Sequence, residues 1–180
     1  MSSKHTGELD GVADYLKAQY IRRWGIVNTA KQQSIAEHMY GVWTLIRVWG
    51  PEIDLGPISQ GQAEEWALTH DLAEIRTGDM PTPHKTPEIK SWLNKVEREV
   101  YPAASVIEAN IKGSSVADFC KFCDTAEAIL FLQLNGIGRH AMDVRDVLQL
   151  QMIKRLQESS IADHRQITLL KLFHSAMEAT

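Results

Sequence analysis

Apolar residues recur every three or four positions along most of the chain, and this spacing limits the fold more than any other feature. Between positions 35 and 49 they form the stripe of one helix face: Ile35, Met39, Val42, Trp43, Ile46 and Trp49. No run shows the period of two that marks a half-buried strand, and no repeat or linker divides the 180 residues. The sequence therefore predicts an all-α fold of about seven helices in a single domain, residues 1–180.

Start and stop signals place these helices. We expect them at about residues 8–22 and 35–49, from residues 59 and 87 onward, and at about residues 116–134, 141–157 and 161–177. Ser59 and Gln62 form a capping box that would open the third helix, with His70 near its end. Thr86-Pro87 has the pattern of an N-cap and first helical position, and Pro102 predicts a break or kink.

Composition excludes several classes of protein. Hydrophobic residues make up 44% of the chain and charged residues 23%, which is normal for a globular protein. The formal net charge of −4 disfavours a nucleic acid as partner, because such binding proteins carry a basic face. No apolar run approaches the roughly 20 residues that span a bilayer, and the N-terminus lacks the apolar stretch of a signal peptide. We expect a cytoplasmic protein with no membrane partner.

The two cysteines, Cys120 and Cys123, have the spacing of a redox or zinc motif. Zinc would need two more ligands nearby, and a redox motif would need a strand-to-helix setting. Because the pair lies within a predicted helix, we expect free thiols packed in the core.

His70 and Asp71 are adjacent in an apolar run. Burying either group without a partner costs several kcal/mol, so a core helix has no structural use for the pair. Together they offer a nitrogen and an oxygen ligand to a divalent transition metal. Glu74 follows four residues after His70, so on a helix it shares their face as a general acid or base. A surface His-Asp pair on an amphipathic helix is the alternative.

Cationic side chains gather around these motifs although the chain is acidic overall. They are Arg22, Arg23, Lys31, Arg76, Lys85 and Lys121. Local positive charge on an acidic protein favours a small polyanion as ligand.

Five separated segments resemble one known family in their order and spacing. They are Arg22-Arg23-Trp24, Ala36-Glu37-His38, His70-Asp71 with Glu74, the stretch Gly78–Pro83, and Lys121-Phe122-Cys123-Asp124. Over about residues 15–135 the chain resembles the HD-domain phosphohydrolases, in particular small bacterial 5'-deoxynucleotidases and short phage dATP triphosphohydrolases. One difference is visible, since Gln33-Ser34 stands where the subgroup usually has Glu-Asn. The resemblance implies an HD-domain helical bundle.

The resemblance implies four metal ligands: His38, His70, Asp71 and Asp124. Two imidazoles and two carboxylates suit zinc, cobalt, manganese or iron, and Mg²⁺ is expected only as an ion that accompanies the substrate's phosphates. An exposed helix acid is the alternative for Asp124. A water activated by the metal would attack the α-phosphorus, and Glu74 would orient that water or protonate the leaving 5'-oxygen.

A substrate site beside the metal is also implied. Arg23, Lys85 and Lys121 would hold the phosphate charge, and Thr82 would contribute to binding. Asp79, in a loop rich in proline and glycine, resembles the family's residue that contacts the sugar or shares the proton transfer. An ordinary turn acid is the alternative for Asp79.

Two apolar residues are expected to set specificity. The indole of Trp24 would form a wall against the sugar that leaves no partner for a 2'-hydroxyl. Ile26 would press against the base edge, tolerate a bare purine C2 and resist an exocyclic amino group. His84 would assist phosphate binding, and the remaining histidines lack companions of the kind that bind metal.

Two reactions remain open at this point, because both attack the same phosphorus. One is dATP triphosphohydrolysis, which yields deoxyadenosine and triphosphate and is favoured by the stretch Arg22–Ile26. The other is 5'-deoxynucleotidase action on monophosphates. A degenerate HD module that senses nucleotides is a third alternative, although every ligand type is present. The apolar final helices favour a homo-oligomer.

Overall fold

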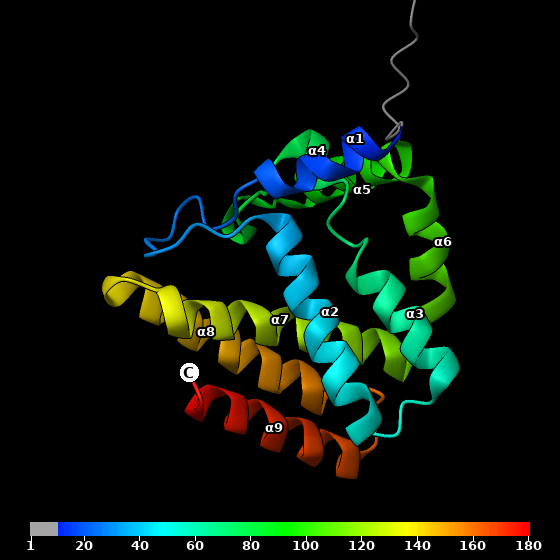
Figure 1. Cartoon of the computed structure of the whole chain (residues 1–180), viewed down its shortest axis with the longest axis vertical. Coiled ribbons are helices and arrows are strands. Elements are labelled where there is room, and N and C mark those ends of the chain that lie inside the picture. Colours follow the sequence, from blue (N-terminus) through cyan, green and yellow to red (C-terminus); the bar gives the residue numbers. More distant parts are fainter. Residues whose placement is uncertain (1–10) are drawn as a thin grey trace, which may run out of the picture.

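The computed structural model describes residues 11–180, which form nine α-helices, two short 3-10 helices and no sheet (Figure 1). In chain order the elements are α1 (Val12–Tyr15), η1 (Leu16–Tyr20), α2 (Ile35–Glu52), α3 (Pro57–Ala67), α4 (Glu74–Thr77), η2 (Thr82–His84), α5 (Pro87–Val100), α6 (Pro102–Ile111), α7 (Ser115–Asn135), α8 (Gly138–Gln157) and α9 (Asp163–Glu178). The predicted all-α fold is confirmed. The count exceeds seven because α4 is an additional single turn and α6 is separate from α5.

Several helix boundaries follow the predicted signals. The Thr86 hydroxyl caps α5 by accepting a hydrogen bond from the Ile89 backbone N–H at 3.4 Å, and Pro87 is the first helical residue. Pro102 opens α6 in the same way, so the expected break is confirmed. At α2, Ser34 and Glu37 form a capping box, with the Ser34 N–H donating to the Glu37 carboxylate at 2.8 Å. This box fixes where α2 begins, and therefore where the residues on either side of it lie.

The first predicted helix is wrong in length and in packing. Its start at Glu8 lies outside the described residues, α1 is a single turn, and the chain continues as the 3-10 helix η1. The side chains of the expected apolar stripe are exposed, with Val12 at 75%, Leu16 at 58% and Tyr20 at 67%. Helical spacing yields a stable α-helix only when another surface covers its apolar face, and no described segment covers this one.

The third predicted helix is wrong at both ends. It begins at Pro57, after Gly56, and Ser59 does not cap it. Proline suits the first helical position because its fixed φ matches the helix and its missing N–H would be unpaired there. The helix ends at Ala67, and residues 68–73 form turns.

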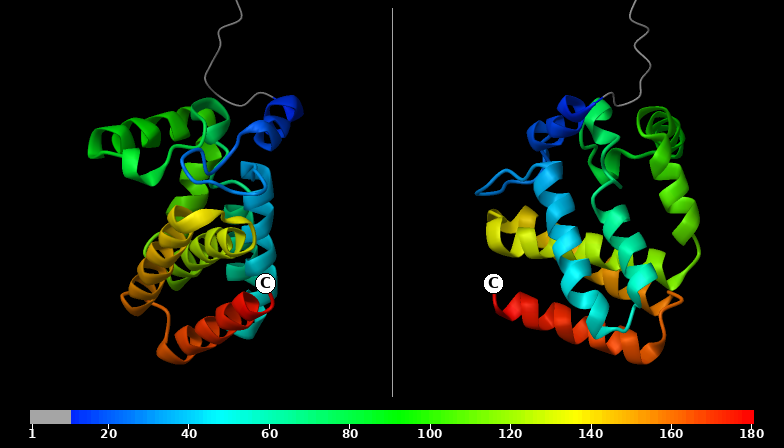
Figure 2. Two further views of the ribbon diagram at one scale, coloured as in Figure 1. Left: turned by 90° about the vertical axis from the view of Figure 1, so that its left-hand side faces the viewer. Right: turned by 45° about the vertical axis from the view of Figure 1, so that its right-hand side comes forward.

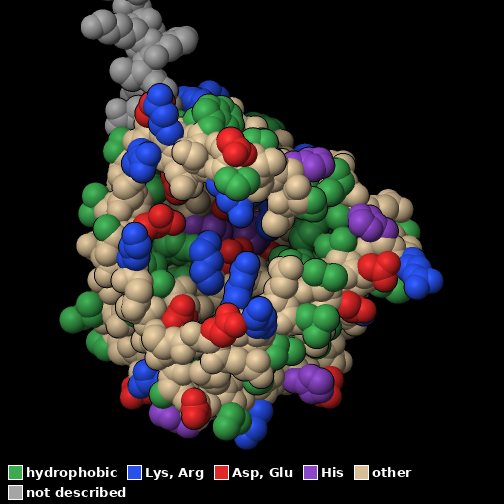
Figure 3. Space-filling view, turned by 180° about the vertical axis from the view of Figure 1, so that it is seen from behind, with side chains coloured by type: hydrophobic (Ala, Val, Ile, Leu, Met, Phe, Trp, Pro, Cys, Tyr) green, Lys and Arg blue, Asp and Glu red, His purple; other side chains and the backbone are tan. Residues whose placement is uncertain are grey.

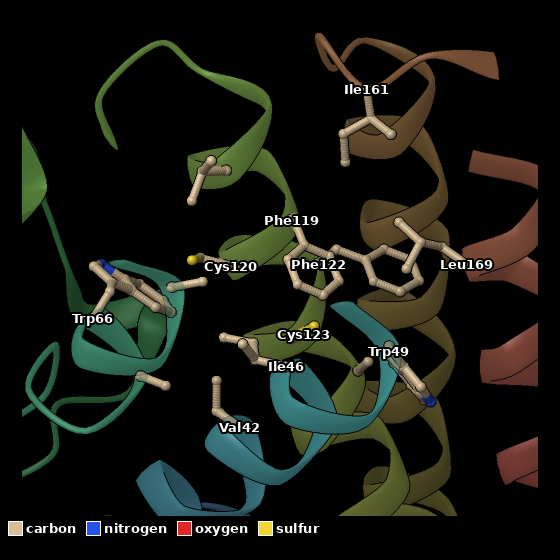
Figure 4. Close-up of a cluster of buried hydrophobic side chains, with 14 of the residues drawn as sticks. Val42, Ile46, Trp49, Trp66, Phe119, Cys120, Phe122, Cys123, Ile161 and Leu169 are labelled. Carbon is tan, nitrogen blue, oxygen red and sulfur yellow. The ribbon is translucent and has the colours of Figure 1, made fainter. Parts of the chain in front are cut away.

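The core is built around α7, which contacts α2, α3, α6, α8 and α9. Figure 2 shows α8 and α9 layered on one side of the molecule, with α5 on the opposite side. Phe119 and Phe122 of α7 meet Val42 and Ile46 of α2 and Leu169 of α9 in one buried cluster (Figure 4). Within residues 11–180, no helix is long and apolar enough to cross a membrane.

Both cysteines lie in this core as free thiols, as predicted. Burial raises the pKa of Cys120 to about 12 and that of Cys123 well above its usual value. A thiol that does not ionise near neutral pH is a poor nucleophile and a poor metal ligand. These residues therefore serve packing.

Candidate functional site

Four predicted ligands converge from three parts of the chain: His38 on α2, His70 and Asp71 after α3, and Asp124 on α7. His38 Nε2 lies 3.1 Å from Asp124 Oδ1 and 3.6 Å from Asp71 Oδ2. His70 Nε2 lies 3.5 Å from Asp71 Oδ2 and 3.9 Å from Asp124 Oδ1. Ligand atoms of His38, His70 and Asp71 all lie within 4.8 Å of one another. This spacing suits a single ion.

The segment that carries His70 and Asp71 is not helical, which corrects the expectation that Glu74 shares a helix face with them. Backbone N–H groups bond three residues back here, including Glu74 to Asp71 at 3.0 Å. The Thr69 hydroxyl donates to the Glu65 and Trp66 carbonyls at 2.7 and 3.4 Å, which draws the chain into turns after α3. Glu74 nevertheless lines the same cavity as Asp71.

Two contacts hold the His70 ring. Its ring stacks on Trp66 with centroids 4.2 Å apart, and its Nδ1 lies 3.0 Å from the Ala67 carbonyl oxygen. A carbonyl only accepts hydrogen bonds, so Nδ1 carries the proton and Nε2 presents its lone pair to the cluster. His70 Nε2 is buried and has no hydrogen-bond partner among the described residues. An orphaned imidazole nitrogen facing two carboxylates fits a metal, which would supply the missing partner.

The charge of the cluster also fits a cation. Burial and the Arg23 guanidinium lower the pKa of His38, but hydrogen bonds to Asp124 and Glu127 outweigh them and raise it to about 9. Burial opposes ionisation of Asp124, yet the His38 hydrogen bond and nearby positive charge hold its pKa well below the usual range. Burial lowers the pKa of His70, which keeps that ring neutral. A metal would replace the proton that the carboxylates hold on His38.

Glu74 differs from the other carboxyl groups in the cavity. Burial, together with the negative charges of Asp71 and Asp79, raises the pKa of Glu74 to about 9. Its Oε2 is buried without a hydrogen-bond partner among the described residues. A carboxyl group that holds its proton at neutral pH beside ionised carboxylates is suited to act as a general acid.

A cavity of about 690 Å³ opens over the cluster. Its lining includes ten of the predicted site residues: Arg23, Trp24, Ile26, Asp71, Glu74, Asp79, Thr82, Lys85, Lys121 and Asp124. Figure 3 shows cationic side chains around a hollow whose depth holds histidine and acidic side chains. The size and the mixed lining are typical of a small-molecule site.

Some predicted residues lie elsewhere, and some lining residues were missed. Of the cations, Lys31 pairs with Glu37 at 2.8 Å and Arg76 with Asp14 at 3.0 Å, so they serve the surface of the described fold. Arg22 and His84 are not among the described residues that line the cavity. Lining residues of α8, among them His140, Gln151 and Arg155, were not predicted, because no motif in the sequence marks them.

Trp24 forms one wall of the cavity in an unusual backbone conformation, with φ at 66°. A non-glycine residue in this left-handed region costs about 1–2 kcal/mol. Its ring is held from several directions, since it stacks on Phe131 with centroids 5.9 Å apart and donates its indole N–H to Gln33 Oε1 at 2.9 Å. Ile26, further along the same segment, is 47% exposed.

Glu127 was missed by sequence reasoning. It lies three residues after Asp124 on α7, and its Oε2 is 2.5 Å from His38 Nδ1. A carboxylate that accepts from one imidazole nitrogen fixes the tautomer and aims the other nitrogen at a metal. The sequence did contain a signal for Glu127, because it lies three positions after Asp124 and residues three apart on a helix share a face.

The comparisons with known proteins agree with this geometry. A family model described as 5'-deoxynucleotidase YfbR-like matches residues 13–129. The chain belongs to this YfbR-like family. A dATP triphosphohydrolase of Cyanophage S-2L is 47% identical to it over 165 residues, which are 92% of this chain and 94% of the relative. The 5'-deoxynucleotidase PM0747 of Pasteurella multocida is 25% identical over 170 residues, covering 88% and 83% of the two chains.

A solved structure supports the same assignment. The Cyanophage S-2L HD phosphohydrolase DatZ, bound to dA and one catalytic Zn²⁺ ion, matches with a TM-score of 0.92 and 45% identity over 96% of this chain and 99% of that one. The YfbR-like chain is thus an HD-domain phosphohydrolase with a metal cofactor, as the sequence motifs indicated.

Proposed function

We propose that this enzyme hydrolyses dATP at the α-phosphorus and releases deoxyadenosine and triphosphate. The observation that carries the proposal is a cavity of about 690 Å³ lined by Asp71 and Asp124 of the cluster, by three predicted cations and by Trp24. His38 and His70 lie outside the lining residues, behind these two carboxylates. The likeness to a phage dATP triphosphohydrolase over 92% of the chain supports the choice of substrate.

We assign the metal to His38, His70, Asp71 and Asp124. A divalent ion in this place supplies Lewis acidity that activates water at neutral pH. Two nitrogen and two oxygen ligands suit zinc, cobalt or manganese, and the catalytic Zn²⁺ of the related phage structure supports zinc. Mg²⁺ would accompany the phosphates.

The protein's own groups supply charge and a proton. Arg23 Nη1 forms an ion pair with Glu127 Oε2 at 3.8 Å but has no hydrogen-bond partner among the described residues, so its N–H is available to donate to a phosphate oxygen. Lys85 and Lys121 add positive charge from the cavity wall, and Thr82 lies beside Lys85 in the same lining. As the bond from water oxygen to phosphorus forms and the bond to the 5'-oxygen breaks, Glu74 donates its proton to that oxygen.

Asp79 and the apolar wall recognise the nucleoside. Asp79 accepts a hydrogen bond from the sugar and keeps negative charge beside Glu74, which its own charge helps to hold protonated. Trp24 faces the sugar and leaves a 2'-hydroxyl without a partner, while Ile26 rejects an amino group at purine C2.

Hydrolysis of deoxynucleoside monophosphates is the second candidate. The family model and the likeness to the Pasteurella 5'-deoxynucleotidase favour it. The two reactions share the attacked phosphorus and differ in whether the cavity admits the β- and γ-phosphates. Arg155 of α8, which also lines the cavity, is a further cation available to those phosphates.

The deciding experiment incubates the metal-loaded enzyme with dATP and with dAMP and identifies both products. Nucleosides are separated by chromatography, and triphosphate is distinguished from free phosphate by ion exchange and a phosphate assay. Deoxyadenosine with intact triphosphate from dATP supports the proposal. Free phosphate from dAMP with little turnover of dATP would replace it with the monophosphatase. Tight binding of both without turnover would indicate a sensor.

The proposed substrate also suggests where the enzyme is located and which partners it has. We place it in the cytoplasm, where free deoxynucleotides are found, with no nucleic acid or membrane partner. We also propose a homo-oligomer, because exposed apolar side chains such as Leu150 of α8 and Ile167 of α9 are available to a second copy.

A further inference from the structure

Gln33 connects the two functional parts of the cavity. Its side chain is only 3% exposed, and it lies between the Trp24 wall and the carboxylate that supports His38. Gln33 Oε1 accepts from the Trp24 indole N–H at 2.9 Å, and Gln33 Nε2 donates to Glu127 Oε1 at 2.6 Å. The other oxygen of Glu127 is 2.5 Å from His38 Nδ1. The four side chains therefore form one hydrogen-bonded chain from the wall to a predicted metal ligand.

This hydrogen-bonded chain requires at position 33 a group that both accepts and donates, and the Gln33 amide does both. An indole N–H can only donate and an ionised carboxylate can only accept. The group between them must therefore accept on one side and donate on the other, which neither a carboxylate nor an apolar side chain does. The amide orientation is fixed by the same argument, with oxygen toward Trp24 and nitrogen toward Glu127.

We propose that Gln33 is a positioning residue that holds the Trp24 wall and the metal ligand His38 in register, so that sugar selectivity and metal affinity depend on one side chain. Trp24 needs such support because its backbone has a left-handed φ of 66° and it lies in a segment that is not helical. Glu127 also needs support from Gln33, because only one of its two carboxylate oxygens is hydrogen-bonded to His38. The part concerning the sugar rests on the proposed deoxynucleotide substrate, whereas the part concerning the metal does not.

The packing around Glu127 supports the proposal independently. A Cβ added at Gly41 of α2 would lie 2.7 Å from Glu127 Cγ and 2.9 Å from Glu127 Oε1. Oε1 is the oxygen that accepts from Gln33. The glycine at this point of α2 thus leaves the space in which the Gln33–Glu127 hydrogen bond forms.

The test compares Gln33→Leu with Gln60→Leu. Gln60 is the control, because it is a partly buried glutamine whose Nε2 donates to the Ile46 carbonyl at 3.0 Å and to Glu64 at 2.8 Å, between α2 and α3 and outside the cavity lining. Zinc affinity is measured on the metal-free proteins by competition with a chromophoric chelator. Sugar selectivity is measured as the ratio of kcat/KM for dATP and ATP, or for dAMP and AMP if only monophosphates react.

Loss of Gln33 should weaken zinc binding about 10- to 100-fold, the range for removal of a group that supports a ligand, and should lower the selectivity ratio about tenfold or more. Gln60→Leu should change melting temperature alone. Gln33→Glu keeps the acceptor for Trp24 and loses the donor to Glu127, so it should weaken zinc binding while most of the selectivity remains.

Gly41→Ala keeps the test decisive if Gln33→Leu does not fold, because alanine favours the helix while displacing Glu127. It should weaken zinc binding although the helix itself is strengthened. Unchanged zinc affinity and selectivity in folded Gln33→Leu, or in Gly41→Ala, would overturn the inference. Failure of the unmutated protein to hydrolyse dATP or dAMP would overturn the proposed function instead. The zinc titration would still show whether Gln33 supports metal binding.

Discussion

The metal cluster and the nucleoside wall of the same cavity are built in different ways. The cluster draws on α2, on the turns after α3 and on α7, and His38 in it is fully buried. The wall, formed by Trp24 and Ile26, belongs to the non-helical segment between η1 and α2, and Ile26 is 47% exposed. Burial between packed elements fixes the side chains of the cluster rigidly, whereas loops at the rim tolerate change. Chemistry should therefore fail outright when the cluster is altered, and selectivity should shift when the wall is altered.

The largest effect is expected at the cluster. His70→Ala or Asp71→Ala should abolish bound metal and all measurable turnover, and should lower the melting temperature, because metal binding stabilises the fold that assembles its ligands. Elemental analysis and differential scanning calorimetry measure both effects. His164→Ala, at an exposed position of α9, is the control and should keep its metal. A full complement of metal in purified His70→Ala would remove the distinction between the two regions.

Substitution of Glu74 tests whether a group beside the cluster transfers a proton without binding the metal. Glu74→Ala should keep metal and nucleotide binding but lower kcat by about 10²–10⁴-fold, the range for a positioned acid or base. Steady-state kinetics with metal analysis of the same sample measure this, and Glu65→Ala, at an exposed position of α3, is the control. An unchanged kcat in the Glu74 variant would show that another group transfers the proton.

The wall should give smaller and selective effects. Each group that the wall strips of water without offering a partner costs about 1–3 kcal/mol, or roughly ten- to hundred-fold in kcat/KM. Trp24→Ala should admit ATP while dGTP remains a poor substrate, and Ile26→Ala should admit dGTP while ATP remains poor. Competition assays with pairs of nucleotides measure the ratios. Comparable kcat/KM for dATP and dGTP in the unmutated protein would contradict the role of Ile26.

The smallest effect concerns stability, on a helix that carries neither function. Burial and the charge of Glu108 raise the pKa of Glu97 on α5 from 4.5 to about 6. Folding therefore favours the protonated form, so the free energy of unfolding should fall as pH rises from about 4.5 to about 6 and stay lower above that range. Glu97→Gln should remove this dependence and gain about 1 kcal/mol or less at pH 7.5, after allowance for the group's partial exposure.

Thermal melts at pH 4.5 and 7.5 measure this difference, with the exposed Glu99→Gln of the same helix as control. Turnover should be unchanged in both variants. Equal pH dependence in Glu97→Gln and in the unmutated protein would show that solvent screens Glu97 fully.

Helix formation was readable from sequence wherever a long apolar stripe coincided with local end signals. At α7 the stripe and Gly136 gave the boundaries to within one residue, and Thr86-Pro87 gave the start of α5. The segment at Val12, Leu16 and Tyr20 has similar spacing, yet it forms only short turns because no described helix covers these three side chains. Helical spacing predicts which face of a helix is apolar. Whether that face is buried depends on the other elements that pack against it.

From sequence, the adjacent His70-Asp71 pair in an apolar run predicted a nitrogen and an oxygen ligand for a metal, and the family resemblance added His38 and Asp124. The sequence also indicated a polyanionic ligand through Lys85 and Lys121. The tertiary structure alone placed Glu127 against His38, 89 residues away, and Gln33 against Glu127, 94 residues away. Local patterns report contacts within about one helical turn. A hydrogen bond between distant segments exists only once packing has fixed both of its ends.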